Sequence, residues 1–215
     1  MEILHTDNSI LVINKPAGIP VLPDGWDKDA PYLVRQLEEQ FGKVWIVHRL
    51  DKITSGVMIF ARTSEMHRTL NMQFERHEIQ KVYHAIVVGT PTWNEHTARH
   101  PLRIDVGHSH RTVVDHSKGK PAETHFHILE RYTSHSLLEA IPGTGRTHQI
   151  RVHAYALGYP LLGDTLYSAP ETDLIGRPAL HACSLEFTIE GKPFRFTAPY
   201  PEDFAEVLKK LRTRS

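Results

Sequence analysis

The N-terminal part of the chain consists of short apolar runs separated by turn residues. Residues 10–13 form a β-branched run that ends at residues 14–18 (Asn-Lys-Pro-Ala-Gly), an order that predicts a strand followed by a turn. Residues 44–47 predict a second short strand, which leads into His48-Arg49-Leu50-Asp51. Residues 57–61 (Val-Met-Ile-Phe-Ala) are apolar throughout and predict a buried strand.

Four segments repeat apolar residues at helical spacing. Pro31 opens the first, and Ser64 is expected to cap the second. The third covers residues 147–157, with Gly158 in the position that commonly follows a helix, and Pro201 starts the last. The apolar positions of these helices are Leu33, Leu37 and Phe41; Met66, Leu70 and Phe74; Ile150, Ala154 and Leu157; and Phe204, Val207, Leu208 and Leu211.

Strands are expected to outnumber helices in the rest of the chain. Residues 82–88, 123–129 and 136–141 have extended patterns and do not alternate regularly with helices. This favours an α+β fold with a largely antiparallel or mixed sheet over a doubly wound fold. No linker interrupts the sequence, so residues 1–215 are predicted to form one domain, with residues 94–120 as a protruding arm or an insertion.

Composition limits the class of protein. Hydrophobic residues make up 40% and charged residues 23% of the chain, as in ordinary soluble globular proteins. No apolar run approaches the roughly 20 residues that span a bilayer, so no membrane partner is expected. A single cysteine, Cys183, excludes an internal disulfide, and we expect a structural role for it and a cytoplasmic location for the protein.

The formal net charge is zero, which gives no indication of a polyanionic partner. Positive residues nevertheless gather in residues 99–120 and at the C-terminus. They are Arg99, Arg103, Arg111, Lys118 and Lys120, and then Lys209, Lys210, Arg212 and Arg214. Composition alone therefore leaves nucleic-acid binding open.

The first candidate for chemistry is the segment of residues 48–56, His-Arg-Leu-Asp-Lys-Ile-Thr-Ser-Gly. A carboxylate on a loop next to a strand is a common way to present a nucleophile or a base. Asp51 is flanked there by Arg49 and Lys52, which favour its ionised form. Taken alone, the same pattern also fits an aspartate that caps a turn.

The second candidate is the glycine-rich turn and helix start at residues 143–153. Such a turn offers backbone N–H groups and a helix dipole to an anion. His148, Arg151 and Tyr155 are spaced as one polar stripe of the helix. Because Arg151 falls close to the apolar stripe, it requires an anionic partner, which the residues alone allow to be structural or catalytic.

Sixteen histidines raise the question of a metal. His108/His110 and His125/His127 are His-x-His pairs, whose side chains share one side of a strand. No His-Glu-x-x-His or Cys-x-x-Cys motif is present, so we expect no metal and assign the pairs to a solvated face or to phosphate contacts. Phosphate-binding, dinucleotide-binding and Gly-x-Ser-x-Gly motifs are also absent.

Four segments, in order, resemble the motifs of the RluA family of RNA pseudouridine synthases. Residues 48–56 are similar to the family signature, and residues 14–18 to its N-terminal turn. Residues 81–85 (Lys-Val-Tyr-His-Ala) are similar to the second motif and residues 145–153 to the third. The resemblance extends to Gly158, Gly163-Asp164, Leu180-His181-Ala182 and Ala198-Pro199-Tyr200-Pro201, and so covers nearly the whole chain.

The resemblance implies a fold, a reaction and the residues that carry it. The fold would be the pseudouridine synthase core, a long mixed or antiparallel sheet with flanking helices and a central cleft. The reaction would break the bond between uracil N1 and ribose C1′, turn the base and rejoin it through C5, with no cofactor and no metal. Asp51 would be the catalytic carboxylate, Arg151 its partner and Tyr83 the ring against the target uracil. The implied substrate-binding residues are Arg49, which would displace the target nucleotide, Arg146 and His148.

The position of Asp51 near the start of the chain implies a short family member without an added N-terminal RNA-binding domain. Such a member is expected to act, as a monomer, on a stem-loop of tRNA or large-subunit rRNA. Residues 99–120 are expected to influence the choice of RNA. Two alternatives stay open: a noncatalytic RNA-binding protein on the same fold, and a histidine-ligated metalloenzyme.

Overall fold

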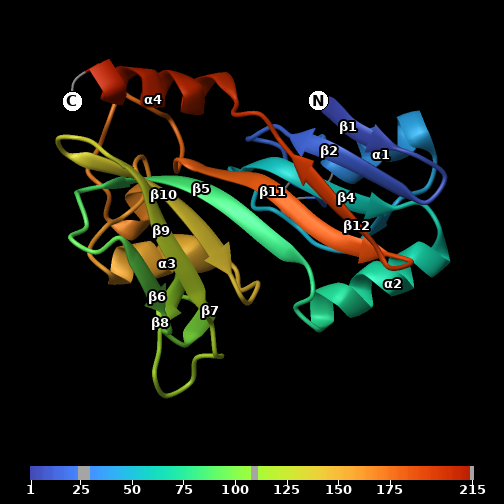
Figure 1. Cartoon of the computed structure of the whole chain (residues 1–215), viewed down its shortest axis with the longest axis horizontal. Coiled ribbons are helices and arrows are strands. Elements are labelled where there is room, and N and C mark those ends of the chain that lie inside the picture. Colours follow the sequence, from blue (N-terminus) through green and yellow to red (C-terminus); the bar gives the residue numbers. More distant parts are fainter. Residues whose placement is uncertain (24–29, 108–110, 214–215) are drawn as a thin grey trace. The chain divides into compact units, whose positions relative to one another are not determined.

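The computed structural model describes residues 1–23, 30–107 and 111–213 (Figure 1). Residue contacts divide the chain into two compact units: Met1–Lys81 with Ala182–Pro199, and Val82–His181 with Tyr200–Ser215. The boundary falls inside strands β5 (Gln80–Val88) and β11 (Leu180–Ile189). His108, His110 and Arg214, which the sequence analysis singled out, lie outside the described residues.

The first unit contains antiparallel strands built on the apolar run at residues 57–61. β1 (Glu2–Thr6) pairs with β2 (Ile10–Lys15), and β2 pairs with β4 (Ser55–Ala61) from Ile10 opposite Ala61 to Lys15 opposite Gly56. The short β3 (Trp45–Ile46) also pairs with β4, and β12 (Lys192–Thr197) pairs with β11. Every residue of β4 is buried, as its unbroken apolar pattern predicts.

Gly56 explains why the motif ends in glycine. Its φ of 120° is a backbone conformation that side-chain-bearing residues rarely adopt. A Cβ at this position would lie 2.1 Å from the carbonyl oxygen of Ala182 in β11, the strand next to β4 in the sheet order. Both the conformation and the close approach of the two backbones therefore require glycine here.

Two helices complete the first unit. α1 (Leu33–Phe41) buries Leu33 and Leu37, as its spacing predicts, and ends at Gly42. α2 (Ser64–Glu75) is capped by Thr63, whose hydroxyl accepts the backbone N–H of Met66 at 3.1 Å. The prediction of Ser64 as the cap is wrong by one residue, because Ser64 already belongs to the helix while Thr63 has the extended backbone of a cap.

The second unit contains a four-stranded antiparallel arrangement in the order β5-β10-β9-β6. β9 (Thr124–Arg131) and β10 (His135–Pro142) match predicted strands, whereas β6 (Glu95–Ala98) lies in the stretch predicted as an arm. β7 (Leu102–Val106) and β8 (Arg111–Val114) form a separate antiparallel pair. Together with the strands of the first unit, this confirms the predicted α+β fold with largely antiparallel pairing.

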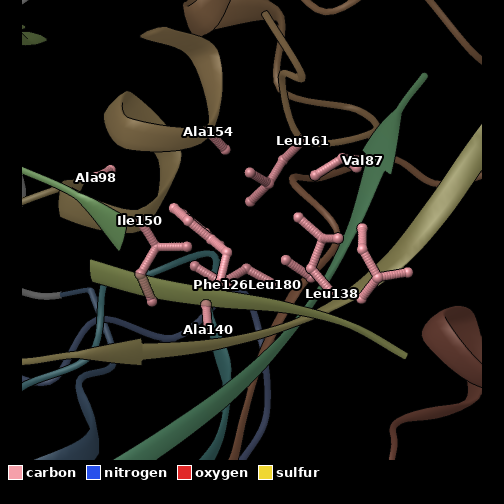
Figure 2. Close-up of a cluster of buried hydrophobic side chains, with 11 residues drawn as sticks. Val87, Ala98, Phe126, Leu138, Ala140, Ile150, Ala154, Leu161 and Leu180 are labelled. Atoms are coloured by element: carbon pink, nitrogen blue, oxygen red, sulfur yellow. The ribbon is translucent and has the colours of Figure 1, made fainter. Parts of the chain in front are cut away.

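Alternating residues of β5 contact two different helices of the second unit. Ala85 and Val87 belong to a cluster with Ile150 and Ala154 of α3 (Gln149–Ala156), shown in Figure 2. Ile86 belongs to a second cluster, with α4 (Glu202–Thr213). The buried residues of α4 are the predicted Phe204, Val207, Leu208 and Leu211. The period of two along the strand therefore gives β5 a buried residue on each face.

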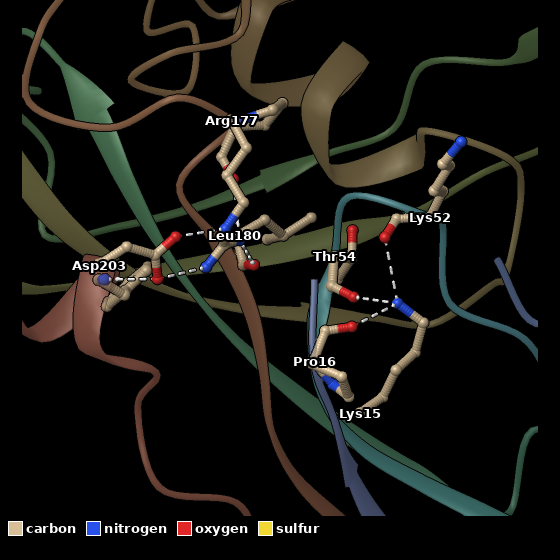
Figure 3. Close-up of polar contacts among 9 residues, drawn as sticks. Lys15, Pro16, Lys52, Thr54, Arg177, Leu180 and Asp203 are labelled. Atoms are coloured by element: carbon tan, nitrogen blue, oxygen red, sulfur yellow. Dashed lines mark hydrogen bonds and ion pairs between the residues drawn. The ribbon is translucent and has the colours of Figure 1, made fainter. Parts of the chain in front are cut away.

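The start of α4 is fixed by Arg177, which lies in the loop between η1 (Thr165–Tyr167) and β11. The guanidinium of Arg177 forms two hydrogen bonds to the carboxylate of Asp203, at 2.7 and 2.9 Å, and donates to the carbonyl of Leu180 (Figure 3). Asp203 lies in the first turn of α4, where a negative charge complements the helix dipole.

Candidate active site

Asp51 lies in a tight turn between β3 and β4. The backbone N–H of Thr54 donates to the carbonyl of Asp51 at 3.0 Å, which closes the turn. Leu50 and Thr54 are buried, whereas the Asp51 side chain is partly exposed. The neighbouring Arg49 is exposed. The turn thus buries the residues that anchor it and leaves the candidate carboxylate and a cation accessible.

A buried lysine donates hydrogen bonds to the main chain of this turn. Lys15, at the end of β2, is fully buried. Its Nζ donates to the carbonyl oxygens of Thr54 at 2.8 Å, Pro16 at 3.0 Å and Lys52 at 3.2 Å (Figure 3), and lies 3.3 Å from that of Asp51. Burying an ammonium is costly unless hydrogen bonds replace its water shell, and these carbonyls do so. Lys15, from the segment 14–18, therefore holds the main chain of the turn.

His48 anchors the start of the segment 48–56, which contains Asp51. Its Nε2 accepts the backbone N–H of Ile59 in β4 at 3.0 Å, and its ring stacks on Phe74 with a centroid distance of 4.8 Å. Burial, with a smaller contribution from Lys81, lowers the pKa of His48 to about 3. The ring is therefore neutral at physiological pH, with its proton on Nδ1, and it acts as an acceptor for the sheet. Neither Lys15 nor His48 was predicted as a site residue.

Tyr83 lies in β5, opposite Ala140 of β10. It is partly buried and packs against the cluster that contains Phe126 and Ile150. The alternation of β5 places it on the same side of the strand as Ala85 and Val87, the side that contacts α3. Tyr83 and the third motif thus contribute to one apolar cluster of the second unit.

The turn before α3 is organised by the side chain of Gln149. Its Oε1 accepts the backbone N–H of Arg146 at 3.0 Å and the hydroxyl of Thr144 at 2.6 Å. Its Nε2 donates to the carbonyl of Glu123 and the hydroxyl of Thr124. Because Gln149 already uses the N–H of Arg146, that amide does not serve the predicted anion site. The exposed side chain of Arg146 remains as the cation of this turn.

Arg151 has its anionic partner inside the second unit. Its guanidinium makes a bidentate pair with Asp164, with both N–O distances 2.7 Å and side-chain exposures of 3% and 1%. The guanidinium carbon also lies 4.9 Å from the ring centroid of Tyr167. The sequence left open whether the anionic partner of Arg151 is a structural or a catalytic acid. This contact supports a structural acid, and the pairing of Arg151 with Asp51 stays a prediction.

The predicted polar stripe of α3 does not form a single surface. Arg151 is buried, whereas Tyr155 is 44% exposed. His148 precedes the helix with φ 55° and ψ 17°, the left-handed region, so α3 begins at Gln149 rather than at residue 147. The apolar prediction is confirmed, since Ile150 and Ala154 are buried in the cluster of Figure 2.

His125 and His127 lie on β9, and Glu95 of β6 is directly opposite His127. The carboxylate of Glu95 is 3.3 Å from Nδ1 of His127 and 4.0 Å from Nε2 of His125. Within the described ranges 1–23, 30–107 and 111–213, no group of three or more His, Cys, Asp or Glu side chains has the arrangement of a metal site.

Across those same ranges, none of the helices has the length and apolarity to cross a membrane.

Residues 9–156 match the family model described as RNA pseudouridylate synthase, and the chain therefore belongs to this family. An RNA pseudouridine synthase of Zymomonas mobilis, named as uncharacterized, is 41% identical over 214 residues, which cover 96% of each protein. Ribosomal large subunit pseudouridine synthase D of Xylella fastidiosa is 37% identical over all of this chain and 70% of its own. The solved structure of human RNA pseudouridylate synthase domain containing 4 superposes with a TM-score of 0.80 and 28% identity, over 98% of this chain and 93% of that one.

Proposed function

We propose that this protein converts uridine to pseudouridine in a stem-loop of tRNA, large-subunit rRNA or both, with Asp51 as its catalytic carboxylate. The observation that carries the proposal is the turn at Asp51. Lys15 and His48 fix its main chain at both ends, so residues that do not react set the position of the Asp51 carboxylate. A catalytic group needs this kind of support from residues that do not react.

The reaction breaks the N1–C1′ bond, turns the freed uracil and forms a C5–C1′ bond, after which the proton on C5 is lost and N1 gains one. No electrons are exchanged with a second substrate, so side chains suffice. Asp51 supplies the negative charge that reacts with the nucleotide or stabilises the cleaved ribose. Tyr83 supplies a flat apolar face for the uracil, and Arg151 is proposed as the cationic partner of the site.

Several names support RNA as the substrate class. Relatives from Xylella fastidiosa and Pseudomonas aeruginosa, at 37% and 38% identity, are named as ribosomal large subunit pseudouridine synthases. We assign RNA contacts to Arg49, Arg146 and His148. Arg49 and Arg146 are exposed, as a group that enters an RNA stem or contacts a phosphate must be.

Residues 99–120 are proposed to influence which RNA is bound. Within this segment, Arg103 pairs with Asp115 at 2.8 Å, and Arg99 pairs with Glu123 at 2.6 Å. Arg111 and Lys118 are exposed. Because acids balance part of the positive charge, we expect a modest dependence of RNA affinity on salt.

We further propose that residues 1–215 work as one catalytic domain, as a monomer in the cytoplasm. The chain passes between its two units inside β5 and β11, so neither unit is a continuous segment of sequence. Cys183 is the single cysteine of the sequence, which suits a reducing compartment.

Release of tritium from RNA labelled at uridine C5 tests the proposed reaction. Unmodified tRNA and rRNA transcripts are assayed separately, with the wild type and Asp51→Asn side by side. Release by the wild type alone establishes both the reaction and the role of Asp51, and shows which RNA to map. RNA binding without release from either pool would instead identify a noncatalytic binding protein.

A further inference from the structure

The turn of residues 115–119, which follows β8, is organised by the side chain of Asp115. Its Oδ1 accepts the backbone N–H groups of Ser117 and Lys118, both at 2.9 Å, and the hydroxyl of Ser117 at 2.8 Å. The backbone N–H of Gly119 closes the turn by donating to the carbonyl of Asp115 at 2.8 Å. The hydrogen bond from the backbone of Lys118, together with those from Ser117, lowers the pKa of Asp115 to about 2. The carboxylate is therefore charged at physiological pH and sets the shape of the turn.

The same turn is attached to the chain that enters β7. The backbone N–H of Asp115 donates to the carbonyl of Pro101 at 2.9 Å. Leu102 and Lys120 exchange two backbone hydrogen bonds, each 2.8 Å long. A Cβ at Gly119 would lie 2.3 Å from the carbonyl oxygen of Asp115 and 2.7 Å from the carbonyl carbon of Pro101. The path of the turn therefore depends on the acceptor at position 115 and on glycine at position 119.

This ordered turn brings two lysines close to the turn before α3. Lys118 and Lys120 are both exposed. The residue after Lys120 is Pro121, whose carbonyl oxygen lies 3.4 Å from Nε of Arg146. Arg146 is exposed as well. The surface of the second unit thus presents Lys120 and Arg146 as neighbours, with Lys118 two residues earlier in the turn.

We propose that Asp115 is a positioning residue for RNA binding, which orders the turn so that Lys118 and Lys120 contact phosphates beside the one bound by Arg146. This inference rests on the proposed function, in which RNA is the substrate. A carboxylate on a surface that binds a polyanion is by itself repulsive. The repulsion is small here, because Arg103 lies 2.8 Å from Oδ2 and the N–H and O–H groups of the turn surround Oδ1.

Two substitutions at position 115 separate the shape of the turn from its charge. Asn keeps an oxygen that accepts the N–H groups of Ser117 and Lys118, whereas Ala keeps none, and both remove the same negative charge. Binding is measured at equilibrium with unmodified tRNA and large-subunit rRNA transcripts, in an Asp51→Asn background. Asp115→Asn should bind RNA at least as tightly as its parent, and Asp115→Ala about fivefold more weakly, the effect of one lost hydrogen bond. Equal effects of the two substitutions, in either direction, overturn the proposal.

The salt dependence of binding distinguishes a lost phosphate contact from partial unfolding. Lys118→Ala should lower the slope of log affinity against log salt by about 1. Asp115→Ala should lower this slope too, although it makes the net charge more positive. In the Asp115→Ala background, Lys118→Ala should change Kd less than about twofold, because the contact is already lost. A steeper slope in Asp115→Ala, or multiplying effects of the two substitutions, would show that Asp115 does not act through Lys118.

Arg99→Ala is the matched control for the lysine. Arg99 is an exposed cation of the same segment, but Glu123 already balances its charge at 2.6 Å. The substitution should therefore leave the salt slope nearly unchanged. A loss as large as that of Lys118→Ala would mean that the overall charge of residues 99–120, and not the turn, determines RNA binding, and would overturn the proposal.

A substitution without any change of charge keeps the inference testable if Asp115→Ala does not fold. Gly119→Ala forces the turn away from Pro101 and should weaken RNA binding about fivefold. Gly176→Ala, at a position where a Cβ meets no atom within 4 Å, is its control and should bind like the wild type. Equal binding by the two variants overturns the proposal. Absence of tritium release by a wild type that shows the predicted binding pattern would refute the proposed reaction and support the role of Asp115.

Discussion

The turn at Asp51 and the segment around Arg151 are stabilised in different ways. The turn at Asp51 is held through its main chain, by the ammonium of Lys15 on carbonyl oxygens and by an imidazole on a backbone N–H. The segment around Arg151 is held through side chains, by the pair with Asp164 and the network of Gln149. A loop fixed through its main chain tolerates a change of side chain, whereas a loop fixed through side chains does not. Substitutions in the two loops should therefore separate activity from stability.

The largest effect on activity is expected at Asp51. Asp51→Asn keeps the size of the side chain and leaves the contacts of Lys15 and His48 in place. The rate of tritium release should fall by about a thousandfold or more, while the midpoint of thermal unfolding stays within about 1 °C of the wild type. Glu65→Gln, an exposed acid in the first turn of α2, is the matched control and should retain full activity. Release near the wild-type rate would remove Asp51 from the mechanism.

The largest effect on stability is expected at the buried pair of Arg151 and Asp164. Asp164→Asn leaves the buried guanidinium of Arg151 without a compensating charge, which costs about 3–5 kcal/mol of unfolding free energy. The double variant Arg151→Met with Asp164→Leu removes both charges and should recover most of that stability, but not the activity. Urea unfolding followed by circular dichroism measures both. If the single variant is as stable as the wild type, the second loop is not held by this pair.

The sequence predicted local elements better than the contacts between them. The apolar run of β4 and the stripes of α3 and α4 follow from residues a few positions apart, and the structure confirms them. The separation of β6 from the β7–β8 pair was missed, because the sequence analysis predicted one arm or insertion for residues 94–120, although Leu102, Ile104 and Val106 of β7 alternate with polar residues. Thr63 was passed over as a cap because two adjacent hydroxyl residues fit the same pattern.

Local sequence patterns do not reveal the residues that support the site. Lys15 is fully buried, although lysine is among the residues most often exposed, and its carbonyl partners on the Asp51 turn are distant in sequence. The contact of Tyr167 with Thr112 spans 55 residues of sequence. Such contacts depend on the fold as a whole. The resemblance to a family marked the residues proposed to react, whereas the structure shows those that hold them.

A smaller loss of stability is expected at Lys15. Lys15→Met keeps the length of the side chain but leaves buried carbonyl oxygens on the turn without a donor, at a cost of about 1–3 kcal/mol. Because the turn carries Asp51, the rate of tritium release should fall as well. Lys209→Met, at an exposed position of α4, is the control for lost charge and should be as stable as the wild type. Equal stability of Lys15→Met and Lys209→Met would mean that the carbonyl contacts do not hold the turn.

His48 is expected to make the stability of the protein depend on pH. Its pKa is about 3 in the folded protein and about 6.5 in an unfolded chain, so between these values the unfolded state binds a proton that the folded state does not. The contribution of His48 to unfolding free energy is therefore complete above pH 6.5 and is lost as the pH falls toward 3, by up to about 1.4 kcal/mol per pH unit.

His48→Gln tests this dependence, because its amide oxygen can take the place of Nε2 as the acceptor for Ile59 and does not titrate in this range. Between pH 4 and 6, the unfolding free energy of the variant should depend less steeply on pH than that of the wild type, by about the same slope. His84, His135 and His153 also have pKa values lowered by burial, but they are present in both proteins and cancel in the difference. Parallel curves would show that His48 becomes protonated in the folded protein as readily as in the unfolded chain, and that its ring does not anchor the turn as a neutral acceptor.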